Sequence, residues 1–158
     1  MTRGDRLLAD LENTYQKYAD RRAVVPPKKK LGESLSGLFS KDPKAQAVHL
    51  MFIEDVECGI RDLALLLPEV NSIEPGLCQD YAHRALDLIF APKVMIEKAQ
   101  SDYDRFLAIA EFLTLPLLPF ASREKLEGIY AEQTARTPKR RMLPNQLKMV
   151  QELEALIS

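Results

Sequence analysis

The sequence predicts an all-α protein, with a single helical-bundle-like domain of about five to six helices. Three observations lead to this prediction. Ten prolines stand among the 158 residues, and nearly all of them fall between segments whose apolar residues recur every three or four positions. Only six glycines are present, which suits helices better than strands joined by tight turns. No segment shows the alternation typical of a β-strand.

Residues 1–25 are predicted to form an N-terminal helix, from about Asp5 to Ala23, because its apolar residues share one face. Residues 26–42 follow as a linker. Two prolines open this linker, and it contains three consecutive lysines and two glycines. Its leucines leave room for one short amphipathic helix. We therefore expect the N-terminal helix and linker to precede, partly detached, a compact all-helical domain over residues 43–158.

The domain is predicted to begin with a helix from Pro43 to about Leu67, where Pro68 should stop it. Gly59 lies on its broad apolar face and would allow another helix to cross closely. The opposite side is also partly apolar, since Leu50, Met51 and Leu65 lie there among charged residues. A helix with apolar residues on two sides is typical of a central position or a subunit contact.

Four further helices are predicted from proline positions and apolar spacing. The first two should span about 75–90 and 92–115. Ser122 has the character of an N-cap residue and should open a helix over 123–136. The last helix should begin at Pro144 and extend to Ile157.

The connection between the predicted helices over 92–115 and 123–136, residues 113–120, is apolar where connections are normally polar. Two prolines should keep it stiff and extended. Its large side chains must either fill the domain core or form a patch that a partner covers, and we expect the core. These side chains are Leu115, Leu117, Leu118 and Phe120.

Two patterns in the sequence contain residue types that can ligate a metal ion. Asp80-x-x-His83 has the spacing of a carboxylate–histidine pair in a di-metal helical bundle, but such a centre needs two pairs that face a core. This single pair lies opposite the apolar face of its helix and should point to solvent. His49 and Cys58 should lie about 13–14 Å apart along one helix, which is too far for two ligands of one zinc ion. We expect no metal.

Catalytic signatures are absent from the sequence: no glycine-flanked serine and no phosphate-binding glycine loop is present. We therefore expect no cofactor and, on balance, no enzyme activity. His49 lies on an apolar helix face, which is the setting of either a core histidine or a pocket residue. The alternative function is thus a small-molecule-binding protein or an enzyme, with a pocket between helices lined by His49, Tyr81 and Tyr103.

Charge and hydropathy limit which kind of partner the protein could bind and in which cellular compartment it is expected. The net charge is −1, and neither basic run, 28–30 or 139–141, is interleaved with aromatic residues. A nucleic-acid-associated regulator that uses these basic loops is therefore only the third functional hypothesis. The N-terminus lacks the apolar run of a signal peptide, no 18-residue apolar stretch occurs, and the two cysteines fit reduced thiols. We expect a cytoplasmic protein with no membrane contact.

The interpretation that these patterns favour is a non-catalytic helical protein that acts through protein–protein contacts or self-association, with a homo-oligomer as one form. If a partner and not the core covers the connection, the predicted interaction surface combines the connection with the far side of the first domain helix. It comprises Leu115, Leu117, Leu118, Phe120, Leu50, Met51 and Leu65.

Overall fold

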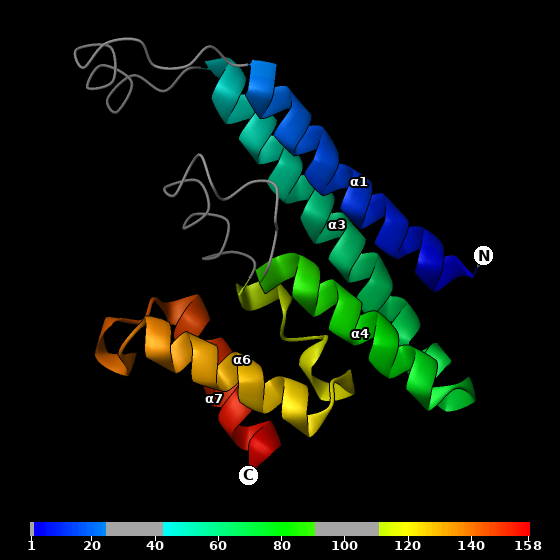
Figure 1. The fold of residues 1–158 in the computed structure, drawn as a ribbon, viewed down its shortest axis with the longest axis vertical. Coiled ribbons are helices and arrows are strands. Elements are labelled where there is room, and N and C mark those ends of the chain that lie inside the picture. Colours follow the sequence, from blue (N-terminus) through cyan, green and yellow to red (C-terminus); the bar gives the residue numbers. More distant parts are fainter. Residues whose placement is uncertain (1, 25–42, 91–110) are drawn as a thin grey trace.

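A computed structural model describes residues 2–24, 43–90 and 111–158, and within these the side chains of 18–24 and 43–50 are left aside. Over the described ranges the chain is helical and contains no strand, which confirms the predicted all-α fold. Figure 1 shows the arrangement. The elements are α1 (Arg3–Val24), α3 (Pro43–Ile73), α4 (Pro75–Phe90), η2 (Leu118–Phe120), α6 (Arg123–Arg136), η3 (Lys139–Arg141) and α7 (Pro144–Ile157).

α1 and α3 form a long antiparallel pair, and α4 packs against both (Figure 1). α1 contributes Leu8, Leu11 and Tyr15 to the buried core. The N-terminal helix is therefore part of the same core as α3 and α4, because its apolar face is covered by them. The linker 26–42 lies outside the described residues. The other core residues of this layer are Phe52, Val56, Ile60, Leu63 and Leu67 of α3, and Cys78, Tyr81, Ala82, Ala85, Leu86 and Ile89 of α4.

Close packing of α1 depends on two glycines. A Cβ atom on Gly59 of α3 would lie 2.6 Å from Cδ2 of Leu11, so the close crossing expected at this glycine is present. A Cβ atom on Gly4 would overlap the ring of Tyr81 in the same way. Farther along the pair, the rings of Tyr15 and Phe52 meet edge to face, with centroids 5.2 Å apart.

α6 and α7 form a second unit, a helical hairpin (Figure 1). It is joined to α4 through the segment 114–121, in which η2 packs against α4. Leu117 and Leu118 are fully buried there. The hairpin adds Leu126, Ile129, Met149, Val150 and Leu153 to the core cluster.

One helix end was predicted wrongly. α3 does not stop before Pro68 but continues to Ile73. Proline removes one helical N–H donor and crowds the carbonyl of Ala64. However, Leu67 is fully buried and Val70 packs against the core, so tertiary packing on both sides of Pro68 holds the helix together. α4 then follows directly from Pro75.

Other boundaries agree with the sequence pattern. The side chain of Ser122 caps α6 by accepting a hydrogen bond of 3.2 Å from the N–H of Lys125. α1 begins two residues earlier than expected because Thr2 caps it: the Thr2 hydroxyl accepts from the N–H of Asp5 at 3.1 Å. Most of the predicted 92–115 helix lies outside the described residues; its described end, 111–113, is helical.

Candidate functional site

The outward side of α3 carries one continuous exposed stripe, which we call the acidic stripe. Its members recur three or four positions apart and therefore share one side of the helix. The opposite side of α3 supplies the core, and the stripe lies in solvent. The members are Met51, Glu54, Asp55, Cys58, Asp62, Leu65, Glu69 and Ile73.

Large apolar side chains lie along this stripe. Leu65 is 75% exposed, Ile73 is 72% exposed and Met51 is 48% exposed. Met51 and Ile73 are separated by about 33 Å along the helix axis at 1.5 Å per residue. A single exposed leucine is ordinary on a protein surface, but three large apolar residues on one side of one helix form an extended strip that another chain could cover.

The acidic side chains of the stripe have no ion-pair partner among the residues that the structure describes. No salt bridge in the described part of the chain involves Glu54, Asp55, Asp62 or Glu69. The nearest basic residue of α3, Arg61, pairs instead with Glu57 at 2.6 Å. Within the described ranges, the stripe therefore presents four carboxylates without an ion-pair partner among its apolar residues.

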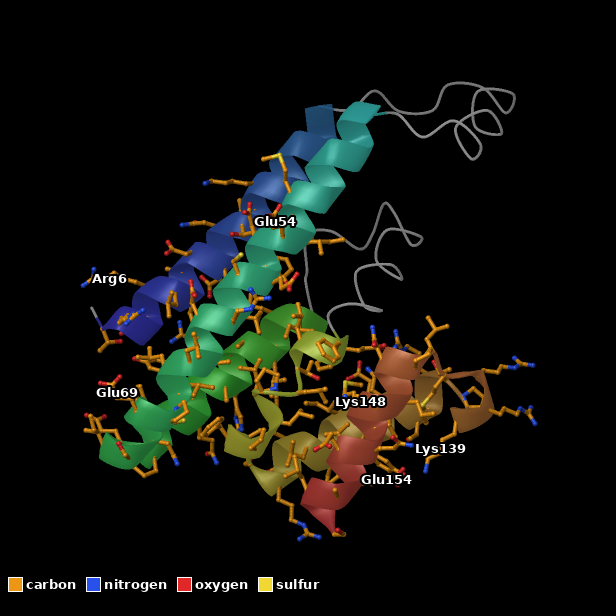
Figure 2. The ribbon with its side chains drawn as sticks, turned by 180° about the vertical axis from the view of Figure 1, so that it is seen from behind. Arg6, Glu54, Glu69, Lys139, Lys148 and Glu154 are labelled. Atoms are coloured by element: carbon orange, nitrogen blue, oxygen red, sulfur yellow. The ribbon has the colours of Figure 1, made fainter. Side chains whose placement is uncertain are left out.

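A second charged surface lies at the turn of the hairpin. We call residues 137–148 the basic connector; they contain four basic residues, Lys139, Arg140, Arg141 and Lys148, and no acidic residue. Figure 2 shows Lys139 and Lys148 on the hairpin, well apart from Glu54 and Glu69 on α3. Leu143 of the same connector is 58% exposed. The connector is thus both basic and apolar.

The backbone of the connector is ordered by its own hydrogen bonds. The N–H of Arg141 donates to the carbonyl of Pro138 at 2.8 Å, and that of Met142 donates to Lys139 at 3.1 Å. The Lys139 ammonium forms an ion pair with Glu154 of α7. Arg140 and Arg141 are exposed and have no such partner among the residues that the structure describes.

A buried polar network lies between the 111–114 segment, α6 and α7. The Arg136 guanidinium donates to Glu111 at 2.5 Å and to the side-chain oxygen of Gln133 at 2.8 Å. The Gln146 amide donates to the same Gln133 oxygen at 3.0 Å. Burial raises the pKa of the Glu111 carboxyl, and Arg136 opposes that rise. Each of these side chains is hydrogen-bonded to another member of the network. The network therefore joins three segments of the chain and does not form an open reactive site.

His83 was expected to point to solvent, and this expectation was wrong. It is half-buried, and its Nε2 accepts a hydrogen bond of 2.9 Å from the N–H of Ser122. The start of α6 covers this side of α4, which helical spacing within α4 alone does not indicate. Asp80 does not pair with His83: its Oδ2 lies 3.7 Å from a terminal guanidinium nitrogen of Arg84. Among the described residues, no three histidine, cysteine or carboxylate side chains are grouped so as to hold a metal ion.

Of the three residues predicted to line a pocket, the structure describes the side chain of one. Tyr81 is almost fully buried between α4 and α1, and its hydroxyl is hydrogen-bonded to that of Thr2. It therefore serves as a packing residue between helices. The side chain of His49 and all of Tyr103 lie outside the described residues.

The predicted interaction surface divides into two parts. Leu117 and Leu118 are fully buried, and Leu115 and Phe120 are half-buried against the core. This segment is also a compact turn rather than an extended strand, because the N–H groups of Leu117 and Leu118 both donate to the Thr114 carbonyl. These leucines thus cannot form a contact surface. The exposed members are on α3, Met51 and Leu65; the side chain of Leu50 is not described.

No helix within 2–24, 43–90 and 111–158 is both long and apolar enough to cross a membrane. Comparison of the chain with protein-family models, with curated proteins and with solved structures finds no match.

Proposed function

We propose that this protein is a non-catalytic helical interaction module that binds a protein segment through the acidic stripe on α3. The observation that carries the proposal is the combination, on one side of one helix, of exposed Met51, Leu65 and Ile73 with carboxylates that have no ion-pair partner in the described part of the chain. A complementary partner segment would present apolar side chains flanked by lysines or arginines.

The two kinds of side chain would contribute differently. Covering a large apolar side chain that is now in water is worth roughly 1.5–3 kcal/mol. Leu65 and Ile73 should therefore supply most of the affinity. The unpaired carboxylates should speed encounter with a basic segment and select against acidic ones. Binding should accordingly weaken as salt screens the carboxylates.

The polar groups elsewhere support a non-catalytic reading. A catalytic acid or base needs an unengaged polar atom that a substrate can reach. His83, whose side chain is half-buried, and Glu111, which is the buried carboxyl of the described parts of the chain, are both already engaged: His83 accepts from Ser122, and Glu111 accepts from Arg136.

A reducing, cytoplasmic compartment is part of the proposal. Both cysteines are free. Cys78 donates its thiol hydrogen to the Leu67 carbonyl at 3.3 Å, and burial raises the pKa of this thiol. It should thus stay protonated and unreactive. Cys58 is exposed on the acidic stripe, where an oxidising compartment would leave it open to unwanted disulfide exchange.

The test uses a synthetic amphipathic helical peptide of leucine and lysine as the probe, with binding followed by isothermal titration calorimetry. Asp55→Lys with Asp62→Lys should weaken binding at least about tenfold. Leu65→Ser should weaken it as well, although it leaves every charge in place. Both changes alter exposed positions, so the fold should persist.

Glu124→Lys with Glu132→Lys is the matched control, because it makes the same charge change at exposed positions on α6. It should leave binding almost unchanged. Equal losses in the control and in the α3 variant would show that the peptide responds to net charge alone. That result, or unchanged binding by Leu65→Ser, would overturn the proposal.

A further inference from the structure

We infer that the segment which the acidic stripe binds is the basic connector of a second copy of this chain, so that the protein associates head to tail. This inference rests on the proposed function and deepens it, because it names the partner. The contact would join the outer side of α3 in one copy to residues 137–148 in the next.

The two surfaces match in chemistry. The stripe has carboxylates without ion-pair partners and exposed Leu65 and Ile73. The connector has guanidinium groups without such partners, on Arg140 and Arg141, and the exposed apolar Leu143. Both statements hold for the described residues. Each surface thus offers the charge and the apolar contact that the other lacks.

The two surfaces do not meet within one copy. α3 belongs to the three-helix layer, whereas the connector lies at the turn of the α6–α7 hairpin (Figure 2). No salt bridge joins them in the described parts of the chain; the connector's one ion pair, Lys139 with Glu154, stays inside the hairpin. Pairing between stripe and connector therefore requires two molecules.

A contact between two different surfaces has a specific consequence for assembly. Each copy that binds through its stripe still carries a free connector, and the reverse also holds. Such a heterologous contact adds further copies until a ring closes, or produces open chains. The expected signature is a gradual, concentration-dependent increase in mass rather than a single stable dimer.

The contact should be weak and sensitive to salt. Exposed ion pairs are weak individually because water and counter-ions screen them. The Debye length is about 10 Å at 0.1 M salt and about 3 Å at 1 M. Sedimentation velocity of the full chain should show association that grows with concentration at about 0.05 M salt and is lost at about 0.5 M.

A complementation experiment tests the pairing directly. The connector variant carries Arg140→Gln with Arg141→Gln, which removes positive charge without adding negative charge, and the stripe variant carries Glu54→Lys with Asp62→Lys, so that the two altered surfaces do not attract each other. Each should be monomeric alone. When mixed, they should form a one-to-one complex that grows no further, because only one intact stripe and one intact connector remain. Arg6→Gln with Lys17→Gln, at exposed positions of α1, is the matched control and should associate like the unaltered chain.

The outcomes separate the two proposals when a peptide of residues 137–148 is titrated into the full chain. If that peptide or the leucine–lysine peptide binds the stripe while the full chain stays monomeric at low salt, the head-to-tail inference is overturned and the proposed function stands. If neither peptide binds, both fail. Association that persists in the connector variant, or a mixture that fails to form the complex, overturns the inference.

Discussion

The backbone N–H of Ser122 donates a hydrogen bond of 2.9 Å to Nε2 of His83. Ser122 is the N-cap residue of α6, and His83 lies in α4. A ring nitrogen can accept this bond only when it carries no proton. The attachment of the hairpin to α4 thus depends on a neutral histidine.

Stability should therefore decrease when the solution becomes mildly acidic. Burial, and next the positive charge of Lys125, hold the pKa of His83 below its ordinary 6.5, while Asp87 and Asp80 act in the opposite direction. The unfolded chain then binds the proton first as pH falls. The contribution of His83 to the free energy of unfolding is fully present above about pH 6.5 and is lost as pH decreases through the pKa of His83 in the folded state.

Urea unfolding of the unaltered chain and of His83→Gln, each measured across this pH range, checks the expectation. The variant's side chain keeps an acceptor but does not titrate, so the difference in free energy of unfolding between the two proteins should change below about pH 6.5. A difference that stays constant with pH would contradict it.

The buried leucine of η2 should be far more sensitive than an exposed leucine of α3. Leu118→Ala should lower the free energy of unfolding by about 2–5 kcal/mol, because it leaves a cavity in the core. Leu65→Ala, the same change at a position that is 75% exposed, should alter it by no more than about 0.5 kcal/mol. Thermal unfolding gives both values, and similar losses would contradict the placement of 114–121.

Two glycines should respond oppositely to alanine. Gly128 of α6 has nothing within 4 Å of an added Cβ, so Gly128→Ala should raise the free energy of unfolding by about 0.4–1 kcal/mol. At Gly59 the added methyl meets buried Leu11. Overpacking there should cost about 1–3 kcal/mol and outweigh the gain in helix propensity. Urea unfolding of both variants provides the comparison; equal stabilisation would exclude close contact between α1 and α3.

The Glu111–Arg136 pair should show a strong dependence on which partner is removed. Arg136→Ala leaves a buried carboxyl without its cationic donor and should cost about 1–3 kcal/mol at neutral pH. Glu111→Gln keeps an acceptor for Arg136 and removes a buried charge, so its cost should be smaller. A double-mutant cycle measured by urea unfolding gives the coupling free energy between Glu111 and Arg136. Additive effects of the two substitutions would contradict the expected interaction.

The pH dependence of Arg136→Ala has a definite sign. Burial already raises the pKa of Glu111 above 4.5, and Arg136 opposes this rise. Without Arg136 the folded pKa should rise further. A raised folded pKa gives stability that is present below about pH 4.5 and lost as pH increases through the folded value. The deficit of this variant relative to the unaltered chain should therefore become smaller at acidic pH.

Local signals predicted a large part of the fold. Pro75, Ser122 and Pro144 mark the starts of α4, α6 and α7, because prolines and N-cap residues act within a single turn. The end of α3 was not predictable in this way. Pro68 has the same local chemistry as the other prolines, and packing of Leu67 and Val70 against the core holds the helix together beyond it.

The site was predicted in part for the same reason. Met51 and Leu65 stood out from the spacing within one helix, and both are exposed. The network of Glu111, Gln133 and Gln146 was not predicted, because its members come from different segments of the chain and none is an unusual residue for its helix. His83 was misplaced because the group that covers it, Ser122, is 39 residues away.

The contact between α4 and the α6–α7 hairpin also determines which part of the molecule should unfold locally at the lowest free energy. α1, α3 and α4 bury one another over the part of the layer whose side chains are described, whereas α6 and α7 meet this layer mainly through the 114–121 segment and its neighbours. Native-state amide hydrogen exchange should therefore resolve two cooperative units. Amides of α6 and α7 should exchange through a lower-energy opening of the hairpin, while those of α4 and the central turns of α3 should exchange only on global unfolding.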